Sequence, residues 1–358
     1  MNDTLSGAAA RSARSATAGL LAGVDIGGTT IAVRLADERL VSVGRSVVET
    51  VRDQPDRAGR QVVDAVATAC AEAGVALERV MAVGIGVPGQ VDPAAGTVST
   101  AVNLGWEHVR LAADVTAVLG VPCALDNDVR AAAEGVRAQR ILGDARDFIY
   151  VSVGTGIAAG IVVDDQVLHG AHQFSGEIGH LVVEPDGPAC ACGQHGCLEA
   201  IASGPAVAGY ARSLIDSGAA SSLRNLEPLT AAHVYAASLT GDQAARAAVT
   251  RGARAMARAF HLLGAILDIP IIAIGGGVTA AGPAFFDPLE QALDVVRAGS
   301  GFAAAVLPRD LVRPLPAGYE PGTWGAVLLA RKGRTSLGVR GQPRKEVGTS
   351  STLADPTD

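Results

Sequence analysis

The stretch that decides the fold is Leu21-Ala-Gly-Val-Asp-Ile-Gly-Gly-Thr-Thr30. Its apolar start predicts a short buried strand, and its glycines predict a sharp turn into a second strand. The same order returns at 148–163, where an apolar run leads to Gly154-Thr-Gly156 and then to another apolar run. Two such units predict two domains built on one plan, with a chance likeness of two β-hairpins as the alternative.

The rest of the chain alternates between helical and strand-like patterns. Helices typically show apolar residues on one face, and short apolar runs bounded by turn residues are typical of strands. An α/β fold with a largely parallel sheet follows from this alternation. The predicted helices span 56–73, 128–139, 204–217, 244–267 and 324–331, and the predicted strands span 21–25, 30–35, 80–87, 121–125, 148–153, 157–163, 166–169 and 271–274.

Length and composition narrow the class of protein. The 358 residues are enough for two domains, and 49% of them are hydrophobic although only 3% are aromatic. The net charge of −7 argues against a nucleic-acid partner, which would require a basic face. The longest apolar stretch, 148–163, is too short to span a bilayer, so we expect no membrane association.

The two repeated units and the composition set the expected domain boundaries. Residues 1–19 lack the apolar core of a signal peptide and are expected to be disordered, with a cytoplasmic location by default. A first α/β domain is expected at 20–139, joined by a closing helix at 324–332, and a second at 140–323. The polar stretch 333–358 is expected to be a disordered tail.

Cys190, Cys192 and Cys197 fall close together, with His180 just upstream. Three thiolates and one imidazole are typical of a closed tetrahedral zinc site, which is structural rather than catalytic. A disulfide with one spare thiol is the alternative, but reduced cytosolic cysteines favour zinc. A structural zinc in the loop 180–197 would hold its neighbours Glu177 and Glu199 in fixed positions.

Three glycine turns each follow a predicted strand. They begin after Asp25, after Val153 and after Ile274, and each offers backbone N–H groups to phosphate oxygens. None matches the P-loop or the Rossmann fingerprint, and one such turn alone is more often only a turn. Asp25 adds a carboxylate at the end of a strand, where it can order the hydration shell of Mg²⁺.

A second polar cluster, Leu125-Asp-Asn-Asp128, lies between a predicted strand and helix. In one interpretation Asn127 or Asp128 only caps the helix, since both are good N-cap residues. In the other, Asp128 accepts a proton from a substrate hydroxyl and Asn127 orients that substrate. The helix N-terminus is expected to keep Asp128 ionised near neutrality. One residue of the pair can cap while the other reacts.

These motifs, in this order, resemble the ROK family of repressors, open-reading-frame proteins and bacterial glucokinase-like sugar kinases. The resemblance covers residues 20–331 and implies the two-domain, actin-like ATPase (ribonuclease H-like) fold with an interdomain cleft. The motifs that carry it are Asp-x-Gly-Gly-Thr at 25–29, Gly-x-Pro-Gly at 86–89, Asn-Leu-x-Trp at 103–106, Asn-Asp-x-x-Ala at 127–131, Gly-Thr-Gly-Ile at 154–157, Glu-x-Gly-His at 177–180 and Cys-x-Cys-Gly-x-x-Gly-Cys-x-Glu at 190–199.

The resemblance also implies a role for individual residues. Asp128 would be the catalytic base, and His180 would bind zinc through one nitrogen and face the sugar with the other. The residues implied to contact the sugar are Pro88, Gly89, Asn103, Asn127, Asp128, Glu177, His180 and Glu199. The residues implied to contact the nucleotide are Asp25, Gly27, Gly28, Thr29, Gly154, Thr155, Gly156, Gly275 and Gly276.

The activity implied is ATP-dependent phosphorylation of the 6-hydroxyl of a hexose, with glucose favoured and with ATP, Mg²⁺ and structural Zn²⁺ as cofactors. His172 and Gln173 stand where glucokinase-like members often have Asn and Gly. An amino- or N-acetyl-hexose (kanosamine, N-acetylglucosamine or N-acetylmannosamine) or fructose therefore stays open as substrate. Similar proteins are commonly homodimers or homotetramers.

A sugar-sensing regulator of the same family is the other class of function that the resemblance allows. Such a regulator needs an N-terminal helix-turn-helix domain of about 60 residues. Only 24 residues precede Asp25, and they show no helical periodicity. A binding protein without catalysis is disfavoured because Asp25, Thr29, Asp128 and Thr155 are all present.

Overall fold

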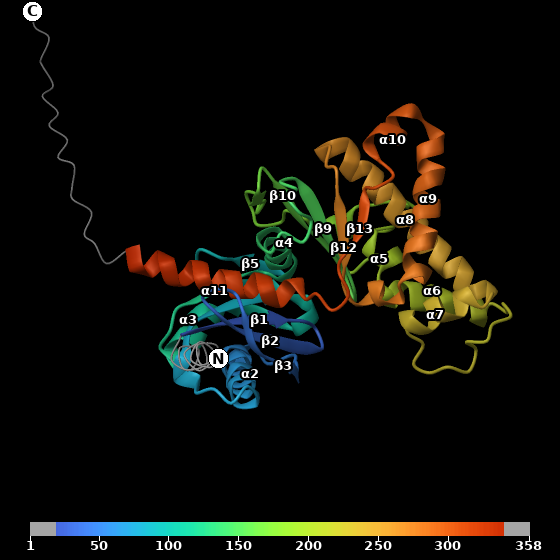
Figure 1. Cartoon of the computed structure of the whole chain (residues 1–358). Coiled ribbons are helices and arrows are strands. Elements are labelled where there is room, and N and C mark those ends of the chain that lie inside the picture. The colour runs from blue at the N-terminus through green and yellow to red at the C-terminus, as the bar shows by residue number, and fades with distance from the viewer. Residues whose placement is uncertain (1–18, 340–358) are drawn as a thin grey trace, which may run out of the picture.

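The computed structural model describes residues 19–339, and two lobes, each built on a five-stranded sheet, form the protein (Figure 1). The predicted disordered segments 1–19 and 333–358 lie mostly outside the described residues. In the first sheet the strand order is β3-β2-β1-β4-β8, and in the second it is β11-β10-β9-β12-β13. The strands of the first sheet are β1 (Leu20–Ile26), β2 (Thr30–Asp37), β3 (Ser42–Glu49), β4 (Val80–Val87) and β8 (Cys123–Asn127), and those of the second are β9 (Phe148–Val153), β10 (Ile157–Val163), β11 (Gln166–Val167), β12 (Ile272–Gly275) and β13 (Val312–Pro314).

The two sheets have one topology. In each, three consecutive strands pair antiparallel, and two further strands then add in parallel on the other side of the first. The glycine turns join strands whose ends pair directly, Ile26 with Ile31 and Val153 with Ile157. The predicted α/β class and repeated hairpin are therefore confirmed, but both sheets are mixed rather than largely parallel, because each begins with an antiparallel three-stranded meander. Strand β11 ends at Val167, before the predicted 169.

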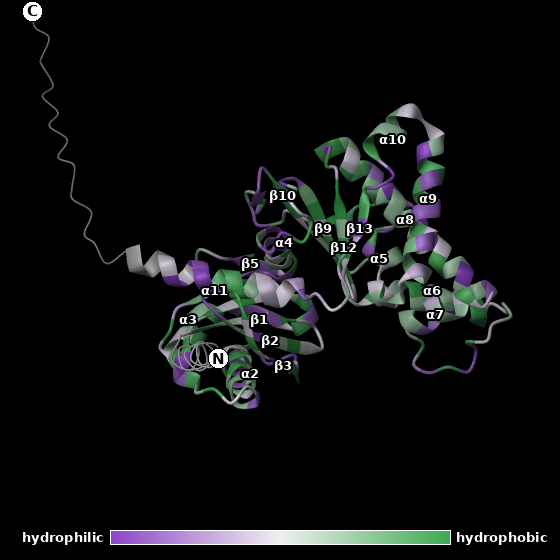
Figure 2. Cartoon of the chain, in the orientation of Figure 1, coloured by the Kyte–Doolittle hydropathy of each residue, from purple (hydrophilic) through white to green (hydrophobic). Residues whose placement is uncertain are grey.

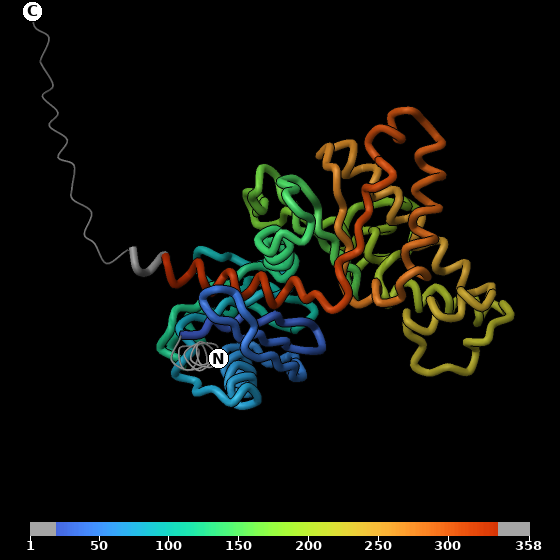
Figure 3. The backbone as a smooth tube through the Cα atoms, viewed as in Figure 1, coloured from blue at the N-terminus to red at the C-terminus, as the bar shows by residue number. Residues whose placement is uncertain are grey.

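Helices and a small third sheet complete the lobes. Alanine-rich helices cover the second sheet, and Figure 2 shows hydrophobic residues along the central strands β9 and β12. Figure 3 traces the chain through the first lobe, the second lobe and back again. The remaining elements of the first lobe are η1 (Pro55–Arg57), α2 (Ala58–Glu72), η2 (Leu77–Arg79), β5 (Gln90–Asp92), β6 (Thr97–Ala101), η3 (Val102–Leu104), β7 (Trp106–Val109) and α3 (Leu111–Leu119), and those of the second are η4 (Ile178–His180), α5 (Glu199–Ala202), α6 (Gly204–Asp216), α7 (Ala231–Leu239), α8 (Gln243–Leu267), η5 (Gly277–Ala281), α9 (Pro283–Gly299) and α10 (Gly301–Val306).

Two helices cross between the lobes. Helix α4 (Asp128–Ala138) follows the first sheet in sequence, yet its apolar residues pack on β9, β10 and β12 of the second. Helix α11 (Pro321–Val339) returns to the first sheet, where it packs on β1 and β4 (Figure 1). Helix α4 therefore contacts α11 of the first lobe as well as the second sheet, and this packing is not visible in local sequence. The domain boundary at 139 stays a prediction.

Glycines make this crossing possible. A Cβ at Gly84 would lie 1.9 Å from the Ala326 carbonyl oxygen, and one at Gly325 would lie 1.7 Å from the Ala131 carbonyl oxygen. Such distances exclude any side chain, so β4 and α11, and α11 and α4, touch backbone to backbone. Helix α11 also extends past the predicted end at 332 and takes in the first residues of the predicted tail.

None of the helices within residues 19–339 is long and apolar enough to cross a membrane.

Four helices of the structure were not predicted from the sequence patterns: α3, α7, α9 and α10. Helices α3, α7 and α10 are short, so their apolar pattern covers too few turns to predict a helix, whereas α9 is long and amphipathic and was simply missed by the sequence interpretation.

Candidate active site

A cavity of about 1100 Å³ opens between the lobes at the carboxyl ends of the parallel strands. Ligands bind at this edge in open α/β sheets, because loops and helix N-termini converge there. From the first lobe it is lined by Asp25, at the end of β1, and by Asp128, at the start of α4. From the second lobe it is lined by Ser152 and by the glycine turn 275–277.

Asn127 caps α4, and Asp128 does not. The Asn127 Oδ1 accepts hydrogen bonds from the backbone N–H of Val129 at 3.0 Å and of Arg130 at 3.2 Å. Its Nδ2 donates to the Gly89 carbonyl at 3.4 Å, which ties α4 to the loop after β4. The Asp128 carboxylate accepts only from the adjacent Val129 N–H, at 3.0 Å, among the hydrogen bonds of the described residues.

Two half-buried carboxyl groups, those of Asp25 and Asp128, face the cavity with raised pKa values. Burial, above all, and the charge of Glu177 raise the pKa of Asp128 to about 6, although the Val129 N–H opposes the shift. Burial and the charges of Asp128 and Glu320 raise the pKa of Asp25 to about 7. Burial outweighs the helix N-terminus and raises the Asp128 pKa above its usual value. At pH 7 Asp128 is still mainly ionised.

The three glycine turns lie around the ends of β1, β9 and β12. Gly27 N–H donates to the Thr30 carbonyl and Gly154 N–H to the Gly156 carbonyl, which closes each hairpin turn. Gly276 has φ of 92°, and a Cβ there would lie 2.4 Å from the Val153 carbonyl oxygen. Only glycine fits this position, which brings the third turn against the strand that leads into the second.

The predicted nucleotide residues do not all line one cavity. Gly275 and Gly276 line the interlobe cavity, whereas Gly154 and Thr155 line an adjoining apolar pocket of about 700 Å³. That pocket also contains Tyr235 and small apolar residues of α6, α7 and η5. The first turn, with Gly27, Gly28 and Thr29, lines neither of them. A Cβ at Gly28 would instead approach Asn103, at 3.9 Å.

The predicted sugar-binding acids are held beside the second glycine turn. Glu199 Oε2 accepts the Ile157 N–H at 2.8 Å, and a Cβ at Gly156 would lie 2.5 Å from the same oxygen. Burial raises the pKa of Glu177, with opposing effects from His180 and Arg130 and a further increase from Glu199. Asp128, Glu177, His180 and Glu199 thus form one electrostatically connected group. Pro88 is half-buried before Gly89.

A buried ion-pair network behind this group was missed by the sequence interpretation. Arg130 is 2% exposed, and its Nε donates to Asp126 Oδ1 at 2.8 Å. Its Nη1 donates to the Gln173 carbonyl at 2.8 Å, and His169 Nε2 lies 2.8 Å from Asp126 Oδ2. Burial raises the pKa of Asp126, but His169 and Arg130 outweigh it and lower that pKa below its usual value.

The network connects α4 with the segment 169–177 that leads to Glu177. Asp126 lies at the end of β8 and Arg130 in the first turn of α4, so the pair forms across the strand-to-helix joint, where the two residues are four positions apart in the chain. That spacing was the only signal in the sequence. Their partners His169 and Gln173 are brought in by β10 and the loop after β11, which no local pattern predicts.

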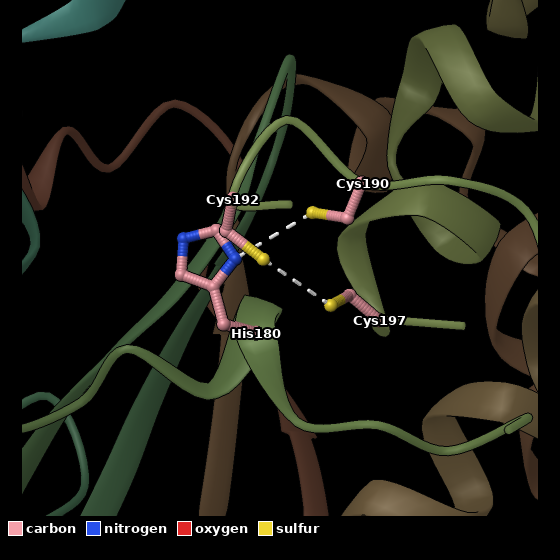
Figure 4. A group of neighbouring side chains, drawn as sticks. All are labelled: His180, Cys190, Cys192 and Cys197. Atoms are coloured by element: carbon pink, nitrogen blue, oxygen red, sulfur yellow. Dashed lines mark hydrogen bonds between the residues drawn. The ribbon is translucent and has the colours of Figure 1, made fainter. Parts of the chain in front are cut away.

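The four predicted zinc ligands converge (Figure 4). The ligand atoms of His180, Cys190, Cys192 and Cys197 all lie within 4.8 Å of one another. His180 Nδ1 is 3.7 Å from Cys190 Sγ, and Cys192 Sγ is 3.6 Å from Cys197 Sγ. Bonds of about 2.3 Å to sulfur and about 2.0 Å to nitrogen put tetrahedral ligands roughly 3.5–3.8 Å apart, so the cluster fits one zinc ion.

The class of protein follows from these features and from comparison with known proteins. The chain shows the two-domain actin-like ATPase fold. A ROK-family glucokinase from Streptomyces griseus, solved with glucose and AMPPNP, superposes with a TM-score of 0.75 at 31% identity, over 88% of this chain and 100% of that one. The family model described as "ROK family" matches residues 21–332. The chain belongs to the ROK family.

Among curated relatives, glucokinase from Streptomyces coelicolor is 31% identical over 323 residues, 88% of this chain and 98% of that protein. Xylose repressor from Caldicellulosiruptor bescii is 28% identical over 284 residues, 77% of this chain and 70% of that protein. The glucokinase relative and the glucokinase structure confirm the prediction of a sugar kinase that acts on a hexose. The repressor leaves a regulatory role open.

Proposed function

We propose that the protein transfers the γ-phosphoryl group of ATP to the 6-hydroxyl of a hexose, with glucose as the preferred substrate. One observation carries the proposal: Asn127 caps α4, so the half-buried Asp128 carboxylate is left to face the cavity. A carboxylate with a pKa of about 6 is ionised at neutral pH and still basic enough to take a hydroxyl proton.

In the proposed reaction the sugar O6 attacks the γ-phosphorus while Asp128 accepts the O6 proton. The bond between the γ-phosphorus and the bridging oxygen breaks, and the electron pair leaves with ADP. Phosphoryl transfer depends mainly on positioning and on neutralising the oxygens of the transferred group. The backbone N–H groups of the three glycine turns are suited to that task.

We place the nucleotide across the second and third glycine turns. The apolar pocket lined by Tyr235, Leu229 and Leu239 adjoins Gly154, Thr155 and Gly277, and its chemistry suits a purine base. Asp25 lies buried beside Asp128 and Glu320, and the mutual repulsion of these acids would be relieved by a bound Mg²⁺ ion. Magnesium would supply charge neutralisation of the phosphates.

Sugar hydroxyls would bind to Asn103, Asn127, Glu177, His180 and Glu199, with Pro88 and Gly89 at the rim. A zinc ion on His180 Nδ1 would leave Nε2 of the same ring to face the sugar. Gln173 Oε1 is buried and has no hydrogen-bond partner within residues 19–339. It can accept from a hydroxyl or from an amino group, which is why amino sugars stay open as substrates.

The test is ADP release with a panel of glucose, fructose, kanosamine, N-acetylglucosamine and N-acetylmannosamine, each with ATP and Mg²⁺. We expect glucose to give the highest kcat/KM, and mass spectrometry with 6-deoxyglucose as the control to locate the phosphate on O6. Turnover of an amino sugar above glucose would correct the substrate, and turnover of none would overturn the proposed activity.

A regulator that only senses sugar is the second candidate, and the xylose repressor relative is the observation in its favour. It predicts sugar binding without ATP turnover. If calorimetry shows that a hexose binds with the same affinity in the presence and absence of ATP, and no ADP is released, this role is favoured over the kinase.

A further inference from the structure

A basic groove lies on the second lobe, away from the interlobe cavity. It has a volume of about 500 Å³ and is formed by α8, α6 and the segment after His180. We call it the arginine groove. Its charged and aromatic lining consists of Glu184, Tyr210, Arg246, Arg251, Arg254 and Arg258. Four guanidinium groups around one carboxylate form a local excess of positive charge on a chain whose net charge is −7.

Several of these side chains are held in place. Arg251 Nη2 lies 2.6 Å from Glu184 Oε2, and the Arg251 guanidinium stacks 4.4 Å above the centre of the Tyr210 ring. Arg258 Nη1 donates to the Val183 carbonyl at 3.1 Å, and Arg246 Nε donates to the Ser238 carbonyl at 3.1 Å. Each of these contacts uses part of a guanidinium fork and leaves other N–H groups facing the groove.

Arg254 lies between these fixed arginines and has no hydrogen bond or ion pair within the described part of the chain. Arg254 and Arg258 are one helical turn apart, and Arg251 and Arg254 are three residues apart. Like charges at these spacings on a helix repel each other and destabilise it. A bound anion removes that repulsion, whereas an ordinary solvated helix face gains by alternating the signs of its charges.

We propose that the arginine groove binds a small phosphate-bearing ligand. Guanidinium groups match a phosphate with paired, parallel hydrogen bonds, and such charge-assisted bonds are the strong ones. The volume suits a molecule the size of a sugar phosphate or a short phosphate chain. The apolar stems of the arginines and the Tyr210 ring provide walls for whatever carries the phosphate.

The position of the groove connects it to the sugar site. A phosphate that pairs with Arg251 competes with Glu184, whose backbone N–H donates to Gly196 inside the zinc loop at 3.2 Å. Val183, which accepts from Arg258, also donates to Gly196, at 2.9 Å. The groove and the zinc loop therefore share one short segment, 183–184.

The test is calorimetric titration of the full-length protein, without nucleotide, with inorganic phosphate, glucose 6-phosphate and tripolyphosphate in turn. The variant is Arg254→Ser/Arg258→Ser, and the matched control is Arg140→Ser/Arg309→Ser, which removes two exposed arginines outside the groove. We expect affinity for the best ligand to fall at least about tenfold in the groove variant and to stay unchanged in the control.

The order of the three affinities shows which part of the ligand the groove recognises. Equal affinities mean that only the phosphate group is bound. A preference for glucose 6-phosphate means that the sugar is also bound, and a preference for tripolyphosphate means that the phosphate chain is bound. Equal affinity in both double variants would place the anion at the glycine turns and overturn the proposal. So would a wild-type Kd above about 10 mM for all three ligands. A wild type that binds none of the three anions, together with a groove variant whose molecular mass in solution is lower than that of the wild type, would also overturn the proposal and identify a subunit interface instead.

Discussion

The two sheets share one topology, but the residues at their strand ends bring different chemical groups to the cavity between them. When the first glycine turn is placed on the second, Asp25 falls on Ser152. The strand that ends the first sheet leads to Asp128, whereas the strand that ends the second leads to apolar Leu315. At the strand ends the first lobe therefore contributes the carboxylates of Asp25 and Asp128, whereas the second contributes the Ser152 hydroxyl and backbone N–H groups, and its acids at the cavity, Asp287 and Glu290, come from helix α9. The two copies of the scaffold therefore differ in the residues at the strand ends that face the cavity.

The lobes differ also in what they insert between their third and fourth strands. Between β3 and β4 the principal element is α2, which covers the first sheet. Between β11 and β12 lie the zinc-ligand loop and helices α5 to α8. Glu177, His180, Glu199 and the arginine groove all belong to this larger insertion. The proposed sugar-binding residues of the second lobe and the proposed anion site therefore lie in the longer of the two connections.

The largest expected effect is that of Asp128→Asn, which tests whether the first lobe supplies the catalytic base. We expect kcat to fall by about 10²–10⁴, because asparagine cannot accept the hydroxyl proton. The melting temperature should change little, since Asn127 and not Asp128 caps α4. Steady-state kinetics and thermal melts on the same preparation measure both effects. Turnover within a few-fold of wild type would exclude Asp128 as the base.

The second prediction concerns the insertion that only the second lobe has. The protein should carry about one zinc per chain, and Cys192→Ser should lose it and melt roughly 10 °C lower, because structural zinc contributes directly to folding free energy. Elemental analysis and calorimetry check this. Cys123→Ala, far from the cluster in sequence, is the control and should retain zinc. An active wild-type preparation that contains no zinc would contradict the prediction.

The third prediction sharpens the role of the buried network between the lobes. His169→Ala removes one of the two partners of Asp126 and loosens the segment 169–177. We expect the KM for sugar to rise about tenfold with kcat nearly unchanged, because a misplaced binding loop weakens substrate binding more than proton transfer. His172→Ala, exposed in the same segment, is the control. A tenfold fall in kcat with an unchanged KM for sugar would instead assign His169 to the chemical step.

The smallest expected effect is on stability against pH. The folded-state pKa values of Asp25 and Asp128, about 7 and about 6, exceed the ordinary value of 3.8. Between about pH 4 and pH 7 the folded state therefore binds more protons than the unfolded state, and these two groups reduce stability as pH rises through that window. Asp25→Asn should flatten this dependence and raise the melting temperature at pH 8 by a few degrees.

Thermal melts of the ligand-free protein from pH 5 to pH 8 measure this effect. Ser152→Ala, at the equivalent position of the second sheet, is the matched control and should leave the pH dependence unchanged. The same protonation should reduce wild-type kcat as pH falls through about 6, because protonated Asp128 cannot accept a proton. A kcat that stays constant down to pH 5 would contradict a base with this pKa.

Much of this protein was determined by its sequence alone. The strands at 148–153, 157–163 and 80–87 match the structure residue for residue. Each is a short apolar run bounded by glycines, proline or charged residues, a pattern typical of a buried strand with well-defined ends. The Cys/His cluster could also be predicted from the sequence, because Cys190, Cys192 and Cys197 are close together in one loop and are residues that typically bind zinc. These features depend on neighbours in the chain.

Only the tertiary structure decided which lobe each crossing helix covers, how burial sets the pKa of Asp128, and which residues surround Arg130. All three depend on contacts between residues far apart in the chain, such as Arg130 with Gln173 or Gly84 with Ala326. A pKa reflects the whole dielectric environment, and a helix packs wherever a complementary apolar surface arises. No local pattern contains that information, because the surfaces exist only after both sheets have formed.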